Sequence, residues 1–400
     1  ALVSSMKNIN YKFIFLVVLV TLVGMGSGLV GSFLARAYLI KETFNFPLFN
    51  EVSITGDRIG SSKLIISEPK KVVVEQNIKI QETISSTKNN IVGIYKKNYQ
   101  AATIDQSKNF DVNSYYLNNE QLAQGFILTT DGWLLSSYTP AEVKNLVNKK
   151  GDNTKNIIEL LAGNYVAISS DKKVYEIDNF VYDKLSGFSF WRIKASGLPV
   201  KQFASPDETA SGQQALAISN QGWAQVITIA SHDTKGIVKS SDGYLDRLIL
   251  NNELNNNFYG SFLVNLNGNL AAVIGNDGKI LSCQSFINPF NGILKSQKIT
   301  RPSLGVNYLS LSYLANYTEN KGAVIQKNEN GIAIASGGPA KDSGLKEGDI
   351  ILAINNIEVN EDNQLNRLIN NYQAGEEVEI KYISNQAIKN VKVKLGVFAN

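Results

Sequence analysis

The longest hydrophobic pattern in the chain is an uninterrupted apolar run near its start. Residues 13–35, FIFLVVLVTLVGMGSGLVGSFLA, contain no charged side chain. At a rise of ~1.5 Å per residue, roughly 20 apolar residues span the hydrocarbon core of a bilayer. The run is longer than the ~7–15-residue apolar region of a cleaved signal peptide. We therefore predict a transmembrane signal anchor over 13–35, behind a short cytoplasmic N-terminus over 1–12.

The pattern changes to short β-type alternation after this run. Residues 36–70 mix charged residues, serine and glycine with small apolar clusters, which predicts a stalk. Residues 72–97 predict a short helix leading into a strand. From about 120 to 298, runs of five to eight residues such as GFILTTDGWLLSS alternate apolar with polar positions between Asp-Gly and Asn-Gly turns. Long helical periodicity is absent there, which favours a sandwich or barrel.

A compact mixed unit is predicted over 301–398. Its pattern is two strands, a short helix, a strand, a second helix and two final strands. In the segment GGPAKDSGLKEGDIILAINNIEV (337–359), Gly344 ends the first helical turn, and Asn355 and Asn356 form a tight hairpin turn. The unit therefore mixes helices and strands within about 95 residues by this count.

Composition excludes several classes of protein. Hydrophobic residues make up 44% and charged residues 18% of the 400 residues, so the chain is not largely disordered. The 39 basic and 35 acidic side chains give a net charge of +4, which does not favour nucleic-acid binding. The one cysteine, Cys283, excludes an intramolecular disulfide and a cysteine-based zinc cluster. We expect no metal and no cofactor.

The segment 337–359 resembles the PDZ family, in the form attached to bacterial HtrA/Deg proteins. RPSLGVNYL (301–309) lies where that family has its carboxylate-binding loop. The resemblance implies that backbone N–H groups of this loop converge on a peptide's C-terminal carboxylate, and that the adjoining strand accepts the peptide as an additional strand. The loop residues so implied are Ser303, Leu304, Gly305 and Val306.

Two further groove residues follow from the same resemblance. Leu365 and Ile369, four apart on one helix face, would line the peptide groove. The alternative for both is an ordinary place in the core. Gly305 is expected at the rim of the groove, where a valine would weaken binding without unfolding the domain.

The middle region resembles an HtrA-type, trypsin-like serine protease. Three segments carry the resemblance in the family's order and spacing: GFILTTDGWLLSSYTPAEV, DKLSGFSFWRIKA (183–195) and LNNNFYGSFLVNLNGNLAAVIG (254–275). The family's histidine, aspartate and serine then fall on Thr139, Gly187 and Tyr259. A glycine that lends an N–H to the oxyanion hole falls on Asn257, whereas Asp183 matches the family's first aspartate of its motif.

None of these three residues can perform the family's chemistry. A threonine does not act as a base near pH 7, a glycine cannot orient an imidazole, and a tyrosine here has no activating partner. The one histidine, His232, is the only place for a histidine base, and we expect it in a surface loop of the second barrel. Cys283 is expected to be a buried strand cysteine, and Ser261 is expected to be inert without a base.

These patterns lead to one main hypothesis about the protein and one alternative. The fold class is mainly β: a transmembrane helix, a degenerate trypsin-like double β-barrel over 71–298 and an α+β PDZ domain over 299–400. We expect a bacterial single-pass membrane protein with its bulk outside the cytoplasm, in the periplasm or at the cell surface. Its partners would be protein C-termini or unfolded segments, and either further copies of itself or an active paralogue. The rival is an active HtrA-type endopeptidase in protein quality control.

Overall fold

The computed structural model describes residues 11–39, 44–46, 49–52, 69–99, 111–147, 153–233 and 236–398, which form two compact units, 1–70 and 71–400. The first unit contains α1 (Tyr11–Leu39) and the two-stranded pair β1 (Phe44–Phe46) and β2 (Phe49–Val52). Within the described residues, α1 is the helix long and apolar enough to cross a membrane, over Phe15–Ser32, with a mean hydropathy of 2.1. The apolar helix is thus confirmed. Most of the predicted stalk lies outside the described residues.

The second unit begins with a closed six-stranded barrel. As predicted, a helix, α2 (Pro69–Lys88), leads into a strand, β3 (Ile91–Lys96). The other five strands are β4 (Ala123–Ile127), β5 (Trp133–Ser136), β6 (Tyr165–Ile168), β7 (Val174–Tyr182) and β8 (Ser189–Ile193). They close in the order β3-β4-β5-β8-β7-β6. The fully buried Trp191 fills the interior, with the ring of Phe180 edge-on at 5.0 Å.

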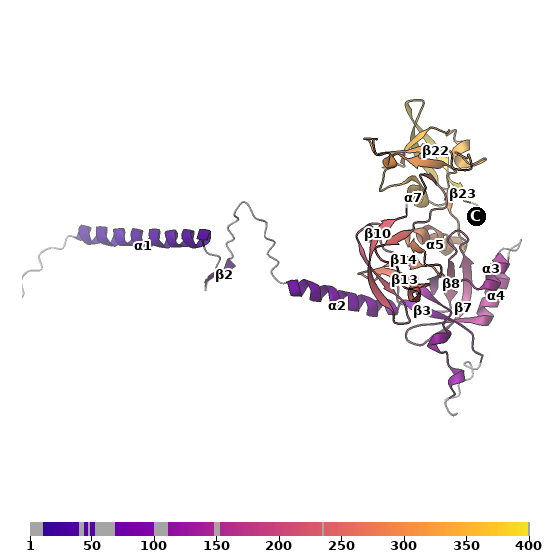
Figure 1. The fold of residues 1–400 in the computed structure, drawn as a ribbon, viewed down its shortest axis with the longest axis horizontal. Coiled ribbons are helices and arrows are strands. Elements are labelled where there is room, and N and C mark those ends of the chain that lie inside the picture. Colours follow the sequence, from indigo (N-terminus) through magenta and orange to yellow (C-terminus); the bar gives the residue numbers. More distant parts are fainter. Residues whose placement is uncertain are drawn as a thin grey trace, which may run out of the picture. The chain divides into compact units, whose positions relative to one another are not determined.

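A second six-stranded sheet forms a near-barrel beside the first (Figure 1). Its strands are β9 (Gln214–Ile218), β10 (Ala224–His232), β12 (Leu248–Leu250), β13 (Phe262–Asn265), β14 (Leu270–Ile274) and β15 (Ile280–Ser282). They follow the order β12-β10-β9-β13-β14-β15, and a bridge between Arg247 and Leu281 brings the two edges together. Phe126 of the first barrel packs edge-on against Phe262 at 5.2 Å, so one hydrophobic cluster extends across both barrels.

The helices of this region correct one expectation. Helices α3 (Ala141–Val147), α4 (Thr154–Asn164) and α5 (Gln284–Ser296) interrupt the strands. Each amphipathic pattern is short: α4 buries Ile157 and Leu161, four residues apart, and α5 buries Phe286 and Phe290. A helical pattern of only two or three turns is not distinguishable in the sequence from the β-type alternation around it. Tertiary packing stabilises these helices.

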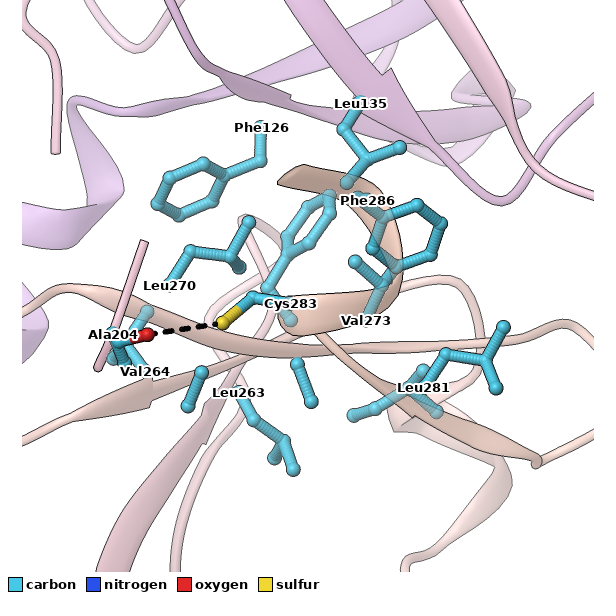
Figure 2. Close-up of a cluster of buried hydrophobic side chains, with 14 of the residues drawn as sticks. Phe126, Leu135, Ala204, Leu263, Val264, Leu270, Val273, Leu281, Cys283 and Phe286 are labelled. Atoms are coloured by element: carbon cyan, nitrogen blue, oxygen red, sulfur yellow. Dashed lines mark hydrogen bonds between the residues drawn. The ribbon is translucent and has the colours of Figure 1, made fainter. Parts of the chain in front are cut away.

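Cys283 illustrates the same correction. It is fully buried, as expected, but it lies at the N-terminal cap of α5 rather than in a strand. Figure 2 shows its sulfur among Phe126, Leu270 and Phe286, with Sγ 3.4 Å from the carbonyl oxygen of Ala204. Burial raises the pKa of this thiol to about 12, so it is protonated and unreactive at neutral pH.

The C-terminal part contains its own core and sheet. Its elements are β16 (Pro302–Ser303), β17 (Asn307–Ser310), β18 (Ala323–Ile325), α6 (Pro339–Asp342), β19 (Ile350–Ile354), β20 (Ile357–Glu358), α7 (Leu365–Asn370), β21 (Glu377–Ser384), β22 (Ala387–Lys394) and β23 (Gly396–Val397). The sheet runs β11-β17-β18-β19-β21-β22, where β11 is the segment Val238–Ser240; β20 pairs with β19, and β16 pairs with β23. The predicted turn is confirmed, because Asn355 and Asn356 both have positive φ.

The edge strand of this sheet comes from a distant part of the chain. β11 (Val238–Ser240) lies between β10 and β12 in the sequence, yet it pairs with β17 of the C-terminal part. The sheet therefore joins two domains that the sequence pattern separates.

Candidate functional site

The three positions predicted to replace a catalytic triad have neighbours that contact one another. Thr139 follows β5, Gly187 precedes β8, and Tyr259 follows a short 3₁₀ turn. The Ser189 hydroxyl, two residues after Gly187, donates to the carbonyl of Tyr138 at 2.6 Å.

The third position is brought to the same place by the loop after β14. Ser137 Oγ donates to Asn276 Oδ1 at 3.2 Å. That oxygen lies 2.8 Å from the point where a Cβ on Gly260 would stand. The structure thus gathers, from both barrels, the chain segments that hold Thr139, Gly187 and Tyr259.

The side chains at these positions offer little chemistry. The Thr139 hydroxyl is buried and has no hydrogen-bond partner among the described residues. Gly187 has no side chain, and Tyr259 is 39% exposed with its ring beside Gly278. Ser261, the nearest serine in sequence, is fully buried and donates its proton to the carbonyl of Phe258. A nucleophile therefore has neither a base nor an orienting carboxylate from these residues.

His232 is not in a surface loop, which corrects the sequence-based expectation. It ends β10, and its side chain is 26% exposed. Its Nδ1 lies 2.7 Å from Oδ1 of Asp246, and its Nε2 lies 3.0 Å from the carbonyl oxygen of Thr209. Because a carbonyl oxygen only accepts, Nε2 carries a proton.

The electrostatics of His232 favour a structural cation. The hydrogen bond with Asp246 raises the pKa of the imidazole, and burial opposes this increase. Nδ1 and Nε2 are both hydrogen-bonded within the protein, to Asp246 and to the carbonyl of Thr209. The carboxylate of Asp246 is itself buried, so it needs a hydrogen-bonding partner. His232, at the end of β10, provides that partner.

The predicted carboxylate-binding loop lies between β16 and β17. Leu304 and Val306 are buried in the C-terminal core, and Gly305 between them has φ +83°. A Cβ on Gly305 would stand 3.3 Å from Cβ of Ala335. The rim position expected for Gly305 is therefore wrong: it is buried, and a β-branched residue there would be strained. Gly305→Val would destabilise the domain as well as change the loop.

Leu365 and Ile369 both lie on α7 and are buried in the core of the same domain. The structure thus places them together, as their spacing predicts. Their contribution to a groove stays a prediction, since core packing alone explains their burial.

An acidic side chain from another segment contacts the loop that was predicted to bind a carboxylate. Asp242 Oδ1 accepts the backbone N–H of Leu304 at 2.8 Å and of Gly305 at 3.1 Å, and Oδ2 accepts the hydroxyl of Ser303. The loop thus holds a carboxylate through converging backbone N–H groups, which is the chemistry predicted for it. The carboxylate belongs to the chain itself.

The loop is fixed at its base by a buried ion pair. Arg301 Nη1 and Nη2 donate to Asp183 Oδ1 and Oδ2 at 2.7 and 2.6 Å, and both side chains are almost fully buried. This bidentate pair joins the first barrel to the residue that precedes β16.

The comparisons with known proteins match both parts of the chain. A family model described as PDZ domain matches residues 302–395. A probable periplasmic serine endoprotease DegP-like from Ectopseudomonas mendocina is 24% identical over 69% of this chain and 56% of its own length. A serine protease Do-like HtrA from Lactococcus lactis is 22% identical over 81% of this chain and 84% of its own.

This chain is similar to HtrA-type proteases, and its C-terminal part matches the PDZ domain. A solved structure of the HtrA-type protease AlgW with tripeptide covers 80% of this chain and 98% of its own, with 17% identity and a TM-score of 0.50, which supports the fold. The predicted fold class, mainly β with a trypsin-like double barrel and a PDZ domain, is confirmed. The chain spans 56% of the length of the E. mendocina relative.

Sequence reasoning missed the residues that join the PDZ domain to the barrels. Asp242 and Ser241 contact the loop over residues 303–306, and Asp183 was identified only as a motif match. The one available signal was the short apolar run Ile237-Val238 before Ser-Ser-Asp-Gly, which indicates an extended segment ending at a turn. Nothing in that pattern names the strand with which it pairs.

Proposed function

We propose that this HtrA-type homologue is a peptide- and protein-binding pseudoprotease, anchored in a membrane with its bulk outside the cytoplasm. Its PDZ domain would recognise protein C-termini or extended segments, and its barrels would perform no hydrolysis. Thr139, Gly187 and Tyr259 at the three triad positions motivate the second part.

The observation that carries the proposal is the state of His232. The chain has one histidine, and both of its ring nitrogens are hydrogen-bonded, to Asp246 and to the carbonyl of Thr209. A serine protease of this family type needs an imidazole that accepts the proton of the nucleophile. His232 offers no free nitrogen, and it comes from the second barrel.

Hydrolysis is tested with unfolded casein and the whole chain in detergent. We expect no casein cleavage above the background of a detergent blank, with trypsin as the positive control. Cleavage that disappears in Ser261→Ala or His232→Gln would favour the rival, an active HtrA-type endopeptidase in protein quality control.

Peptide recognition is supported by the loop geometry. Leu304 and Gly305 present N–H groups to a carboxylate, and the adjoining β17 accepts an antiparallel strand. The test is a fluorescence titration of the whole chain with a labelled free-acid peptide and with its C-terminal amide. We expect dissociation constants around the micromolar range for the acid, about −8 kcal/mol, and markedly weaker binding of the amide. Equal binding of both would contradict carboxylate recognition.

Anchoring and location are supported by α1 and by the relatives. The side chains of Phe15–Ser32 are exposed in the structure, and the E. mendocina relative bears the name periplasmic. Deleting residues 1–36 should move the protein from the membrane fraction to the soluble fraction, because the remaining unit has its own cores. A full-length chain that is already soluble without detergent would argue against the anchor.

Assembly stays open between two proposals, a homo-oligomer or a complex with an active paralogue. Sedimentation of the purified chain distinguishes them, since a homo-oligomer forms without any other protein. A monomer that changes mass only with an added HtrA-type protease would favour the paralogue.

A further inference from the structure

The peptide-accepting edge of the PDZ sheet is covered by a strand of the same chain. β11 runs antiparallel to β17, with Val238 opposite Leu309, Lys239 opposite Tyr308 and Ser240 opposite Asn307. The pairing continues beyond the strand, because Ser241 N–H donates to the carbonyl of Val306 at 2.8 Å. An extended segment that adds a strand in this way is bound by β-augmentation, the mode in which PDZ domains bind peptides.

The covering segment also supplies a carboxylate at the end of the strand. Two residues beyond β11, Asp242 accepts the N–H groups of Leu304 and Gly305. Ser241 Oγ accepts the next N–H, that of Val306, at 3.1 Å. All three successive N–H groups of the loop are therefore satisfied by residues 241 and 242.

The chain turns away at the point where a bound peptide would end. Gly243 has φ +65°, and a Cβ there would stand 3.0 Å from the ring of Phe398. A glycine is needed for this turn and close approach. It lets the side-chain carboxylate of Asp242 take the place of a terminal carboxylate while the backbone continues toward β12.

A third contact defines a side-chain subsite. The Lys239 ammonium donates to Gln364 Oε1, at the N-terminal cap of α7, at 2.9 Å. It also lies 5.2 Å from the centre of the Tyr313 ring, a cation–π distance. An amide oxygen and an aromatic face together select a basic side chain three residues before the carboxylate-bearing residue.

We propose that residues 238–242 are an internal ligand of the PDZ groove, which an external peptide must displace. The inference rests on the proposed function, since it assigns a regulator to that peptide site. The external ligand carries a free C-terminal carboxylate and a lysine or arginine three residues before its last residue.

Displacement reaches the second barrel. The internal ligand lies in the connection between β10 and β12, and Asp246, the partner of His232, follows four residues after Asp242. Release of 238–242 therefore frees a segment whose far end is bonded to β10.

Occupancy is tested first without any peptide. Amide hydrogen exchange at residues 304–306 is measured by mass spectrometry in the whole chain in detergent, for wild type, Asp242→Asn and the control Asp207→Asn. Asp207 is an exposed aspartate of a 3₁₀ turn, 35 residues before Asp242 in the sequence. We expect faster exchange at 304–306 in Asp242→Asn alone, because the charge that holds these N–H groups is lost. Unchanged exchange would overturn the proposal.

Competition is tested with a defined probe, fluorescein-labelled Ile-Val-Lys-Ser-Ser-Ala with a free carboxyl end. We expect Asp242→Asn to bind it about tenfold or more tightly than wild type and Asp207→Asn do, since the internal competitor is weakened. The same peptide with glutamate in place of lysine should bind more weakly to every variant. Equal affinity of wild type and Asp242→Asn would overturn competition by this segment.

The two measurements separate the inference from the function on which it rests. Faster exchange in Asp242→Asn, with no binding of the probe to any variant, would support the internal ligand and contradict peptide recognition by the groove. Tighter binding by the variant supports both.

Discussion

Two buried charges, Asp183 in the first barrel and Arg301 before β16, form a bidentate ion pair next to the loop over residues 303–306. Their side chains are 0% and 2% exposed. Removing one partner of such a pair leaves the other charge buried without compensation, whereas keeping both is nearly neutral against a hydrophobic pair. The pair therefore fixes position more than it adds stability.

Asp183→Asn should therefore destabilise the chain by about 3–5 kcal/mol, measured as a lower thermal or denaturant midpoint. The matched control is Asp131→Asn, which breaks a pair with Arg192 at 3.1 Å on the surface. That change should cost less than about 1 kcal/mol. Equal effects of the two substitutions would contradict a role for burial.

His232 predicts a dependence of stability on pH. Its folded pKa is raised by Asp246, so its stabilising contribution is complete below the ordinary histidine value of about 6.5. The contribution is lost as the pH rises through the folded pKa. The difference in melting temperature between wild type and His232→Gln should be constant below about pH 6.5 and shrink as the pH rises above it.

The titration can be read directly, since the chain has one histidine. A single imidazole resonance in the NMR spectrum should titrate above about 6.5. A resonance titrating below that value would contradict the imidazolium paired with Asp246.

At the scale of elements, the two hairpin turns of the PDZ domain differ in how well their residues fit. Asn355 and Asn356 have φ of 46° and 66°, and the turn between β21 and β22 places Asn385 and Gln386 at 50° and 64°. Asparagine tolerates this region, whereas a glutamine there is strained.

Gln386→Gly should therefore stabilise the domain by about 1 kcal/mol. Asn356→Gly, the matched change in the better turn, should give a smaller gain. The measurement is the urea midpoint of each variant. A larger gain for Asn356→Gly would contradict the ranking.

The sequence predicted those elements whose signals are local. The apolar run of α1, the Asn355-Asn356 turn and the β alternation of both barrels all depend on residues adjacent in the chain. The pairing of β11 with β17 was not predictable in this way, because its partners are about 70 residues apart and each reads as an ordinary short strand.

In the candidate site, too, the sequence predicted some residues and missed others. Positions 139, 187 and 259 came from a spacing match, and the structure places their neighbours in contact. The partner of His232 was missed because Asp246 lies 14 residues further along the chain, between β11 and β12, and no local pattern links the two. Asp242 was missed because its role depends on three N–H groups of a distant loop.

At the scale of the whole molecule, two β-barrels are joined to a C-terminal sheet, and the strand β11 covers the edge of that sheet. One hydrophobic cluster extends across both barrels, and the PDZ domain is joined to them by the Asp183–Arg301 ion pair and by β11. Under the proposed function, this scaffold positions binding surfaces and does not cleave peptide bonds.

The central claim, that this HtrA-type homologue does not hydrolyse peptide bonds, is tested most directly by labelling with a fluorophosphonate probe. The whole chain in detergent is incubated with the probe, with trypsin as the positive control, and labelled residues are identified by mass spectrometry. The account predicts no stoichiometric label, because Thr139, Gly187 and Tyr259 provide no activated serine and His232 has both nitrogens bound. Stoichiometric labelling of any serine would contradict it.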